Sequence, residues 1–98
     1  MQLQDLKSQL TLVFPVRIDC EERRENLRVV LRQLDGLGCR MLVLEADAVP
    51  ALGEEAWPDG VEYTFVEDSS KVFHRTRYIN ELLRMAGTEV VGVWDTDV

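Results

Sequence analysis

The sequence has few of the residues that build disulfide frameworks, metal clusters or glycine-rich phosphate loops. It contains two cysteines and one histidine. Cys20 and Cys39 lack the spacing of metal ligands, so we interpret them as buried or incidental thiols. No G-x-G-x-x-G follows the first apolar run and no G-x-x-x-x-G-K-[ST] occurs anywhere, which argues against a dinucleotide-binding domain and a P-loop ATPase.

Basic residues and long apolar runs are also scarce. Eleven Lys and Arg against eighteen Asp and Glu give a formal net charge of -7, which argues against nucleic-acid binding because a polyphosphate requires a basic face. No apolar run approaches the length of about 18 residues that spans a bilayer, and the first ten residues lack the apolar core of a signal peptide. We therefore expect one cytoplasmic domain over residues 1–98, with residues 1–9 as a leading segment.

Four apolar runs predict β-strands, at Leu10–Val16, Arg40–Ala46, Val61–Val66 and Glu89–Trp94. Most of these runs are almost continuously apolar, as is typical of strands buried on both faces. The segment between the second and third runs contains Pro50, Gly53 and a Pro-Asp-Gly turn, and we expect a loop there with at most a short helix.

Two amphipathic segments predict helices that cross over between strands. In the first, Asp19 is a candidate N-cap, Gly36 or Gly38 ends the helix, and the apolar stripe is Leu27, Val30, Leu31 and Leu34. In the second, Ser69 or Ser70 is the cap, Gly87 ends the helix, and the stripe is Val72, Ile79, Leu82, Leu83 and Ala86.

This alternation of strands and helices predicts an α/β fold with a parallel four-stranded sheet in the order 3-2-1-4. Ligands in such sheets bind beyond the carboxyl ends of the strands, where the winding direction reverses, here between the first and fourth strands. The polar residues expected at these ends are Arg17, Asp19, Glu45, Asp47, Glu67, Asp68, Asp95 and Asp97.

Asp95 and Asp97 are the strongest candidates for a metal site. Alternate residues at a strand end share a face, so both carboxylates can reach one Mg²⁺ or Mn²⁺ ion. The alternative is a solvated strand terminus. An Asp-x-Asp phosphatase would carry its nucleophile after the first strand, whereas this pair follows the last.

Basic and aromatic residues cluster at the start of the second helix. Lys71, Arg75 and Arg77, together with Arg17, could hold an anion or could pair with the excess of acids. Phe73 could pack in the core or present its ring to a base. His74 is more typical of a solvated or capping histidine than of a catalytic base, because the chain has no other histidine.

Five ordered blocks resemble the nucleotide-binding half of glycosyltransferases with the GT-A Rossmann-like fold. The blocks are "PVRID", "ERRENL", "VLEAD", "VFHRTRYINELLRMAG" and "VWDTDV". Family-2 enzymes share this layout, and the closer likeness is to bacterial family-2-like sugar transferases and the β-1,4-galactosyltransferase group. One departure is that "LEADAVPALGEE" stands where family-2 enzymes carry an Asp-Asp-Gly-Ser run.

The resemblance implies roles for individual residues. Pro15, Arg17 and Asp19 would line the uridine and diphosphate site, and Glu45 would lie near the base. Phe73 would stack on uracil and Arg75 would contact the nucleotide. The remaining roles concern the last strand and the second helix: Asp97 would bind Mn²⁺ or Mg²⁺ directly, Asp95 would reach the ribose or a metal-bound water, and Asn80 would brace the helix.

The resemblance implies the N-terminal, donor-binding part of a metal-dependent glycosyltransferase, which transfers a hexose or N-acetylhexosamine from a UDP-sugar to a glycan acceptor. In that family the acceptor site and the general base follow the Asp-x-Asp. We therefore expect a truncated domain that is inactive alone, with no catalytic residue assigned. The alternative is a non-catalytic interaction module that forms a homodimer through its exposed sheet edge.

Overall fold

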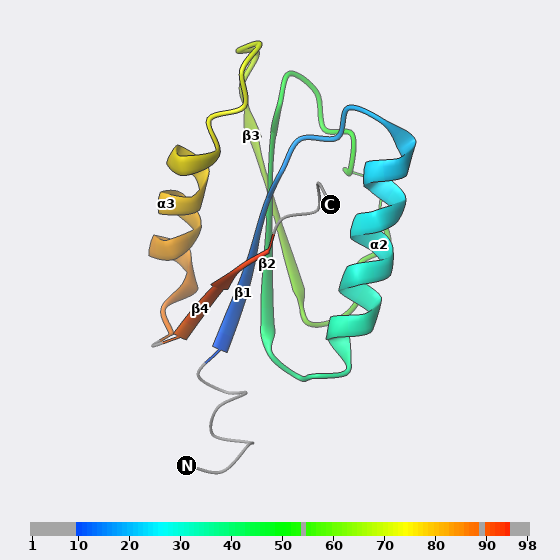
Figure 1. Cartoon of the computed structure of the whole chain (residues 1–98), viewed down its shortest axis with the longest axis vertical. Helices are drawn as coiled ribbons and strands as arrows, with labels where there is room; N and C mark the ends of the chain where they lie inside the picture. The colour runs from blue at the N-terminus through cyan, green and yellow to red at the C-terminus, as the bar shows by residue number, and fades with distance from the viewer. Residues whose placement is uncertain (1–9, 54, 89, 95–98) are drawn as a thin grey trace.

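The computed structural model describes residues 10–53, 55–88 and 90–94 of the chain. Within these residues the strands and helices follow one another in the predicted order (Figure 1). They are β1 (Leu10–Val16), α2 (Glu21–Asp35), β2 (Arg40–Asp47), β3 (Val61–Glu67), α3 (Arg75–Ala86) and β4 (Val90–Val93). Each strand therefore coincides closely with one of the apolar runs in the sequence.

The four strands form one parallel sheet in the order β3-β2-β1-β4, which confirms the predicted fold class and strand order. β1 pairs with β2 along almost its whole length, from Thr11 to Val16. β4 pairs only with the first part of β1, from Leu10 to Val13. The winding reverses between β1 and β4, and ligands in folds of this type bind beside the carboxyl ends of the strands at such a reversal.

The two helices cover opposite faces of the sheet (Figure 1). Side chains alternate between these faces along the central strands. On the α2 face, Phe14 and Val43 pack with Leu27 and Leu31, whereas on the α3 face Leu42 and Leu44 are among the residues that pack with α3. The core consequently has two layers, and β1 and β2 are buried between them.

The two edge strands are less buried than the sequence indicated. β3 is mostly half-buried. Val90 and Val93 of β4 are 41% and 42% exposed, and Trp94, which follows β4, is 40% exposed. The prediction of burial on both faces is therefore correct for β1 and β2 but wrong for β3 and β4. An edge strand has a neighbour on one side only, so fewer side chains cover it.

The helix starts differ from the predicted caps. Cys20, not Asp19, occupies the N-cap position of α2 and makes no side-chain capping bond, while Asp19 forms an ion pair with Arg23 at 3.2 Å. α3 begins at Arg75, so neither Ser69 nor Ser70 caps it. The predicted ends are correct: Gly36 follows α2, and Gly87 follows α3 with φ of 65°, a left-handed conformation that glycine adopts readily.

The buried stripe of α3 also differs from the predicted one. Leu82 and Ala86 are buried as expected, but Leu83 is 44% exposed. Val72 lies before the helix and is 67% exposed. Tyr78 is buried instead, one helical turn before Leu82. The stripe is therefore Tyr78, Leu82 and Ala86, with a spacing of four residues.

The connection between β2 and β3 is the predicted loop, since residues 48–53 and 55–60 form turns and irregular structure. Leu52 of this loop is buried in the core on the α2 face. No helix in the described part of the chain is long and apolar enough to cross a membrane.

Candidate functional site at the carboxyl ends of the strands

Arg17 lies directly after β1 and donates to three carbonyl oxygens, one in β2 and two in the segment after β3. Its Nε donates to the carbonyl oxygen of Ala46 at 2.8 Å, Nη1 to that of Ser70 at 2.7 Å, and Nη2 to that of Asp68 at 3.2 Å. The Asp68 amide also donates to the carbonyl of Asp47 at 2.9 Å. Arg17 thus fixes the segment after β3 against the ends of β1 and β2.

Asp68 is a second anchor of this edge. Its carboxylate accepts a short hydrogen bond from the hydroxyl of Tyr78 and another from the Ser70 amide at 2.9 Å. These bonds, led by that from Tyr78, hold the pKa of Asp68 well below its usual range, with a smaller coulombic contribution from Arg17. Burial and the Asp68 carboxylate raise the pKa of Tyr78. Asp68 is therefore an ionised carboxylate that ties the loop to α3.

Phe73 lies between Arg17 and Tyr78 in sequence and contacts both. Its ring stacks on that of Tyr78 with the centroids 5.6 Å apart, and the Arg17 guanidinium carbon is 5.6 Å from the Phe73 centroid. This distance allows a cation–π contact. Phe73 is half-buried, so part of its side chain remains at the surface. The predicted nucleotide residues Arg17 and Phe73 are thus in contact.

Glu45 is held on the other side of the sheet. It is fully buried, and its carboxylate accepts hydrogen bonds from the amides of Ala51 and Leu52 at 3.0 and 3.1 Å and from the Tyr63 hydroxyl at 2.5 Å. In this conformation Glu45 anchors the loop after β2, and the structure does not bring it to Phe73. Its contact with a nucleotide base stays a prediction.

The other three predicted nucleotide residues lie in β1, after β1 and at the start of α3. Pro15 is buried in β1, paired with Leu44 of β2. Asp19 is exposed beyond Arg17, and Arg75 is exposed at the first position of α3. Their roles toward a nucleotide stay predictions.

Two further basic or capping candidates lie near α3. His74 is exposed at the N-cap position of α3 and makes no side-chain capping bond. The Arg77 guanidinium carbon is 5.9 Å from the Tyr78 ring centroid. The first turn of α3 therefore carries positive charge from the exposed Arg75 and Arg77.

The predicted metal ligands Asp95 and Asp97 lie outside the described residues. Among residues 10–53, 55–88 and 90–94, no three His, Cys, Asp or Glu side chains come together as a metal-binding group. The last described residue, Trp94, donates its amide to the Val13 carbonyl at 3.0 Å. The chain therefore leaves β4 beside β1, and the Mn²⁺ or Mg²⁺ site stays a prediction.

Tyr78 is the residue at this edge that sequence analysis missed. It appears in the polar run "RTRYINE", where an aromatic residue resembles a surface side chain. The signal that could have found it is the spacing Tyr78, Leu82, Ala86, which marks one face of a helix. The hydroxyl group of a buried tyrosine needs a hydrogen-bond partner, and the Asp68 carboxylate accepts this bond.

The structure predicts that Arg17→Lys destabilises the protein although it keeps the charge. One ammonium group cannot reproduce a fork that reaches three carbonyls, so we expect the free energy of unfolding to fall by about 2–3 kcal/mol. Urea denaturation measures this change. Arg84→Lys is the matched control, because its exposed ion pair with Glu81 should contribute less than about 1 kcal/mol. Equal effects of the two substitutions would contradict the role of Arg17.

The depressed pKa of Asp68 predicts a pH-dependent contribution to stability. A carboxyl group with a lowered folded-state pKa stabilises the fold fully above its unfolded pKa of about 4, and this contribution is lost as the pH falls toward the folded value. The stability advantage of the wild type over Asp68→Asn should therefore be larger at pH 7 than at pH 3.

Urea denaturation at the two pH values measures this difference. Tyr78→Phe removes the hydrogen bond that contributes most to the lowered pKa of Asp68, so Asp68→Asn should cost less stability in that background. An advantage of the wild type that does not change with pH would refute the prediction.

Comparisons with known proteins identify no family for this chain. No protein-family model, no curated protein and no solved structure matches it. The observations that bear on function are therefore the geometry of the strand ends and the ordered sequence blocks.

Proposed function

We propose that this domain binds a nucleoside diphosphate sugar, as the donor-binding part of a metal-dependent glycosyltransferase. The observation that supports this most directly is the contact of Arg17 with Phe73 at the carboxyl ends of the strands. Arg17 directly follows β1, the strand beside which the winding of the sheet reverses, and Phe73 lies in the connection between β3 and α3. Both residues belong to blocks that resemble the donor site of GT-A enzymes.

The residues of this site would have different roles toward the donor. Phe73 is half-buried, and a uracil base would stack on the part of its ring that Tyr78 and Arg17 leave uncovered. Arg17 uses Nε, Nη1 and Nη2 on carbonyl oxygens, so its first task is to position Phe73 and the segment after β3. Arg75 and Arg77 are exposed near Phe73, and they supply positive charge toward the diphosphate.

A divalent cation completes the proposed chemistry. Mn²⁺ or Mg²⁺ held by Asp97, with Asp95 at the ribose or at a metal-bound water, would neutralise the diphosphate of the leaving UDP. The cation also removes the repulsion between an acidic chain and an anionic donor, since the net charge of the chain is -7. The transferred group in this proposal is a hexose or N-acetylhexosamine, and the acceptor is a glycan.

This proposal predicts that UDP binds in a manganese-dependent manner. Isothermal titration of the chain with UDP should give saturable binding with MnCl₂ and much weaker binding with EDTA. Asp97→Asn should abolish the manganese dependence, and Phe73→Leu should weaken binding about tenfold through loss of stacking. Val72→Ala is the matched control, because Val72 is 67% exposed beside Phe73. Absence of UDP binding under both conditions would reject the donor site.

A second candidate function is self-association through β4. In the described structure β4 pairs with β1 alone, and Val90 and Val93 of β4 and the following Trp94 are exposed. Unpaired backbone groups and apolar side chains at a sheet edge favour pairing with another strand. We propose a homodimer formed through this edge as the alternative, in which the domain serves as an interaction module.

The homodimer hypothesis predicts that one charged side chain introduced into β4 disrupts the dimer. Sedimentation equilibrium should show a concentration-dependent dimer for the wild type, and Val93→Lys should shift it to the monomer, because a lysine at an edge opposes strand pairing. Val49→Lys is the control, since Val49 is 68% exposed in the loop after β2. A wild type that is monomeric at every concentration would exclude this candidate.

A further inference from the structure

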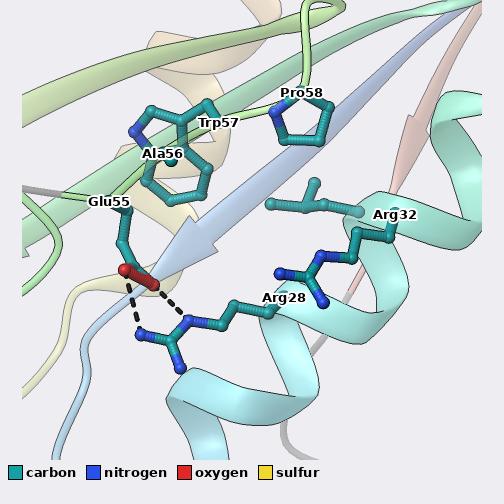
Figure 2. Close-up of a pocket in the computed structure, with 7 residues that line it drawn as sticks. Arg28, Arg32, Glu55, Ala56, Trp57 and Pro58 are labelled. Carbon is teal, nitrogen blue, oxygen red and sulfur yellow. Dashed lines mark hydrogen bonds and ion pairs between the residues drawn. The ribbon is translucent and has the colours of Figure 1, made fainter.

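A pocket on the α2 face is separate from the strand ends. It has a volume of about 210 Å³ and lies between α2 and the segment that leads into β3 (Figure 2). Its lining residues are Arg28, Leu31, Arg32, Glu55, Ala56, Trp57 and Pro58. None of them belongs to the proposed donor site, so this pocket requires its own explanation.

Apolar side chains form the floor and one wall of the pocket. Leu31 is 1% exposed and belongs to the core on the α2 face. Trp57 is half-buried, and its ring stacks on Tyr63 with the centroids 5.4 Å apart. In Figure 2, Trp57 and Pro58 face the arginines across the pocket. The Trp57 ring is therefore held in place before any ligand arrives, which reduces the entropy lost on binding.

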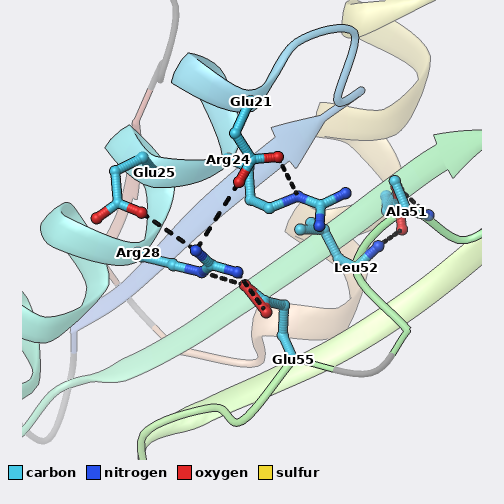
Figure 3. A network of polar contacts seen from close by, with 8 residues as sticks. Glu21, Arg24, Glu25, Arg28, Ala51, Leu52 and Glu55 are labelled. Atoms are coloured by element: carbon cyan, nitrogen blue, oxygen red, sulfur yellow. Dashed lines mark hydrogen bonds and ion pairs between the residues drawn. The ribbon is translucent and has the colours of Figure 1, made fainter.

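Arg28 and Glu55 close one end of the pocket. The Arg28 guanidinium binds both carboxylate oxygens of Glu55, and its Nη1 donates to Glu25 at 3.1 Å (Figure 3). Glu21 adds a weaker ion pair at 4.0 Å. The bond from Arg28 is the largest cause that lowers the pKa of Glu55, so both partners stay charged at neutral pH. Arg28 thus fixes the loop to the helix and has its donors engaged.

Arg32 is the cation that remains available. It is exposed and makes no hydrogen bond or ion pair with any residue that the structure describes, and its charge reaches Glu55 only through the coulombic field. Arg28, Arg32 and Glu55 together give the lining a net charge of +1, although the whole chain carries -7. Because Arg28 is already paired with Glu55, Glu25 and Glu21, Arg32 is the lining residue that would receive a negatively charged group.

We propose that this pocket binds a small aromatic monocarboxylate, with its ring against Trp57 and Leu31 and its carboxylate on the Arg32 guanidinium. An apolar cavity of about 150 Å³ accepts one benzene molecule, so the observed 210 Å³ suits one ring with a carboxylate. A planar guanidinium fork matches a carboxylate in a bidentate pair. A phosphate with nearly two negative charges would exceed the net charge of the lining and approach the Glu55 carboxylate.

Benzoate and benzamide test this site as a pair of probes with the same ring and different charge. The ¹⁵N-labelled chain is titrated with each at equal ionic strength, and the Trp57 indole N–H resonance is assigned through Trp57→Phe. We expect a saturable shift of this resonance with benzoate, and binding of benzamide at least about tenfold weaker, because a charge-assisted bond is lost. No saturable shift with benzoate, or equal binding of the two probes, would overturn the proposal.

Arg32→Gln tests the anchor without disturbing the fold, because Arg32 is exposed on the surface of α2. It should weaken benzoate binding about tenfold and leave benzamide binding unchanged. Arg84→Gln is the matched control, as Arg84 is an exposed arginine on α3 that pairs with Glu81. Unchanged benzoate binding in Arg32→Gln, with preserved spectra, would also overturn the proposal. Since neither probe is a nucleotide, the outcome of the benzoate and benzamide titrations is independent of the outcome of the UDP titration.

Discussion

The Arg17 guanidinium is the interaction on which the carboxyl edge of the sheet depends. A parallel sheet buried on both faces leaves backbone carbonyls at its strand ends, and each buried carbonyl needs a donor. Arg17 supplies a donor to the end of β2 and to the segment after β3 at once. Only arginine combines several fixed donors in one plane. The position of Phe73, and with it the proposed donor site, follows from this arrangement.

Hydrogen-bonded carboxylates at the strand ends explain part of the chain's acidic composition. Glu45 with Tyr63 on the α2 face and Asp68 with Tyr78 at the α3 side form two pairs of the same kind. In each pair a carboxylate at a strand end accepts a tyrosine hydroxyl and one or more loop amides. These hydrogen bonds satisfy the carboxylate oxygens and fix the loops that donate them. Acidic residues at strand ends are thus structural anchors as well as candidate ligands.

The sequence predicts the sheet well because the apolar composition of a strand and the periodicity of a helix can be read from neighbouring residues. The runs at β1 and β2 are apolar because helices cover both faces, and the crossover helices then determine a parallel sheet. The start of α3 was not predictable in the same way. Ser70 looks like a helix cap, but its amide binds the Asp68 carboxylate and its carbonyl accepts from Arg17. Tertiary bonds therefore override the local capping signal, and the helix begins only at Arg75.

The α2 pocket shows why sites formed by distant segments escape prediction from sequence. Arg24, Arg28 and Arg32 recur every four residues on α2, a spacing that alone indicates a solvated charged face. Glu55 is 27 residues from Arg28, yet their paired bond brings the loop over that face. The loop turns part of this row of arginines into a pocket lining. Glu55 of the loop binds Arg28, and Arg32 and Trp57 line the pocket between the loop and α2. Two arginines, Arg17 and Arg28, thus hold the two candidate sites through separate bonds, so that either site can be altered while the other is preserved.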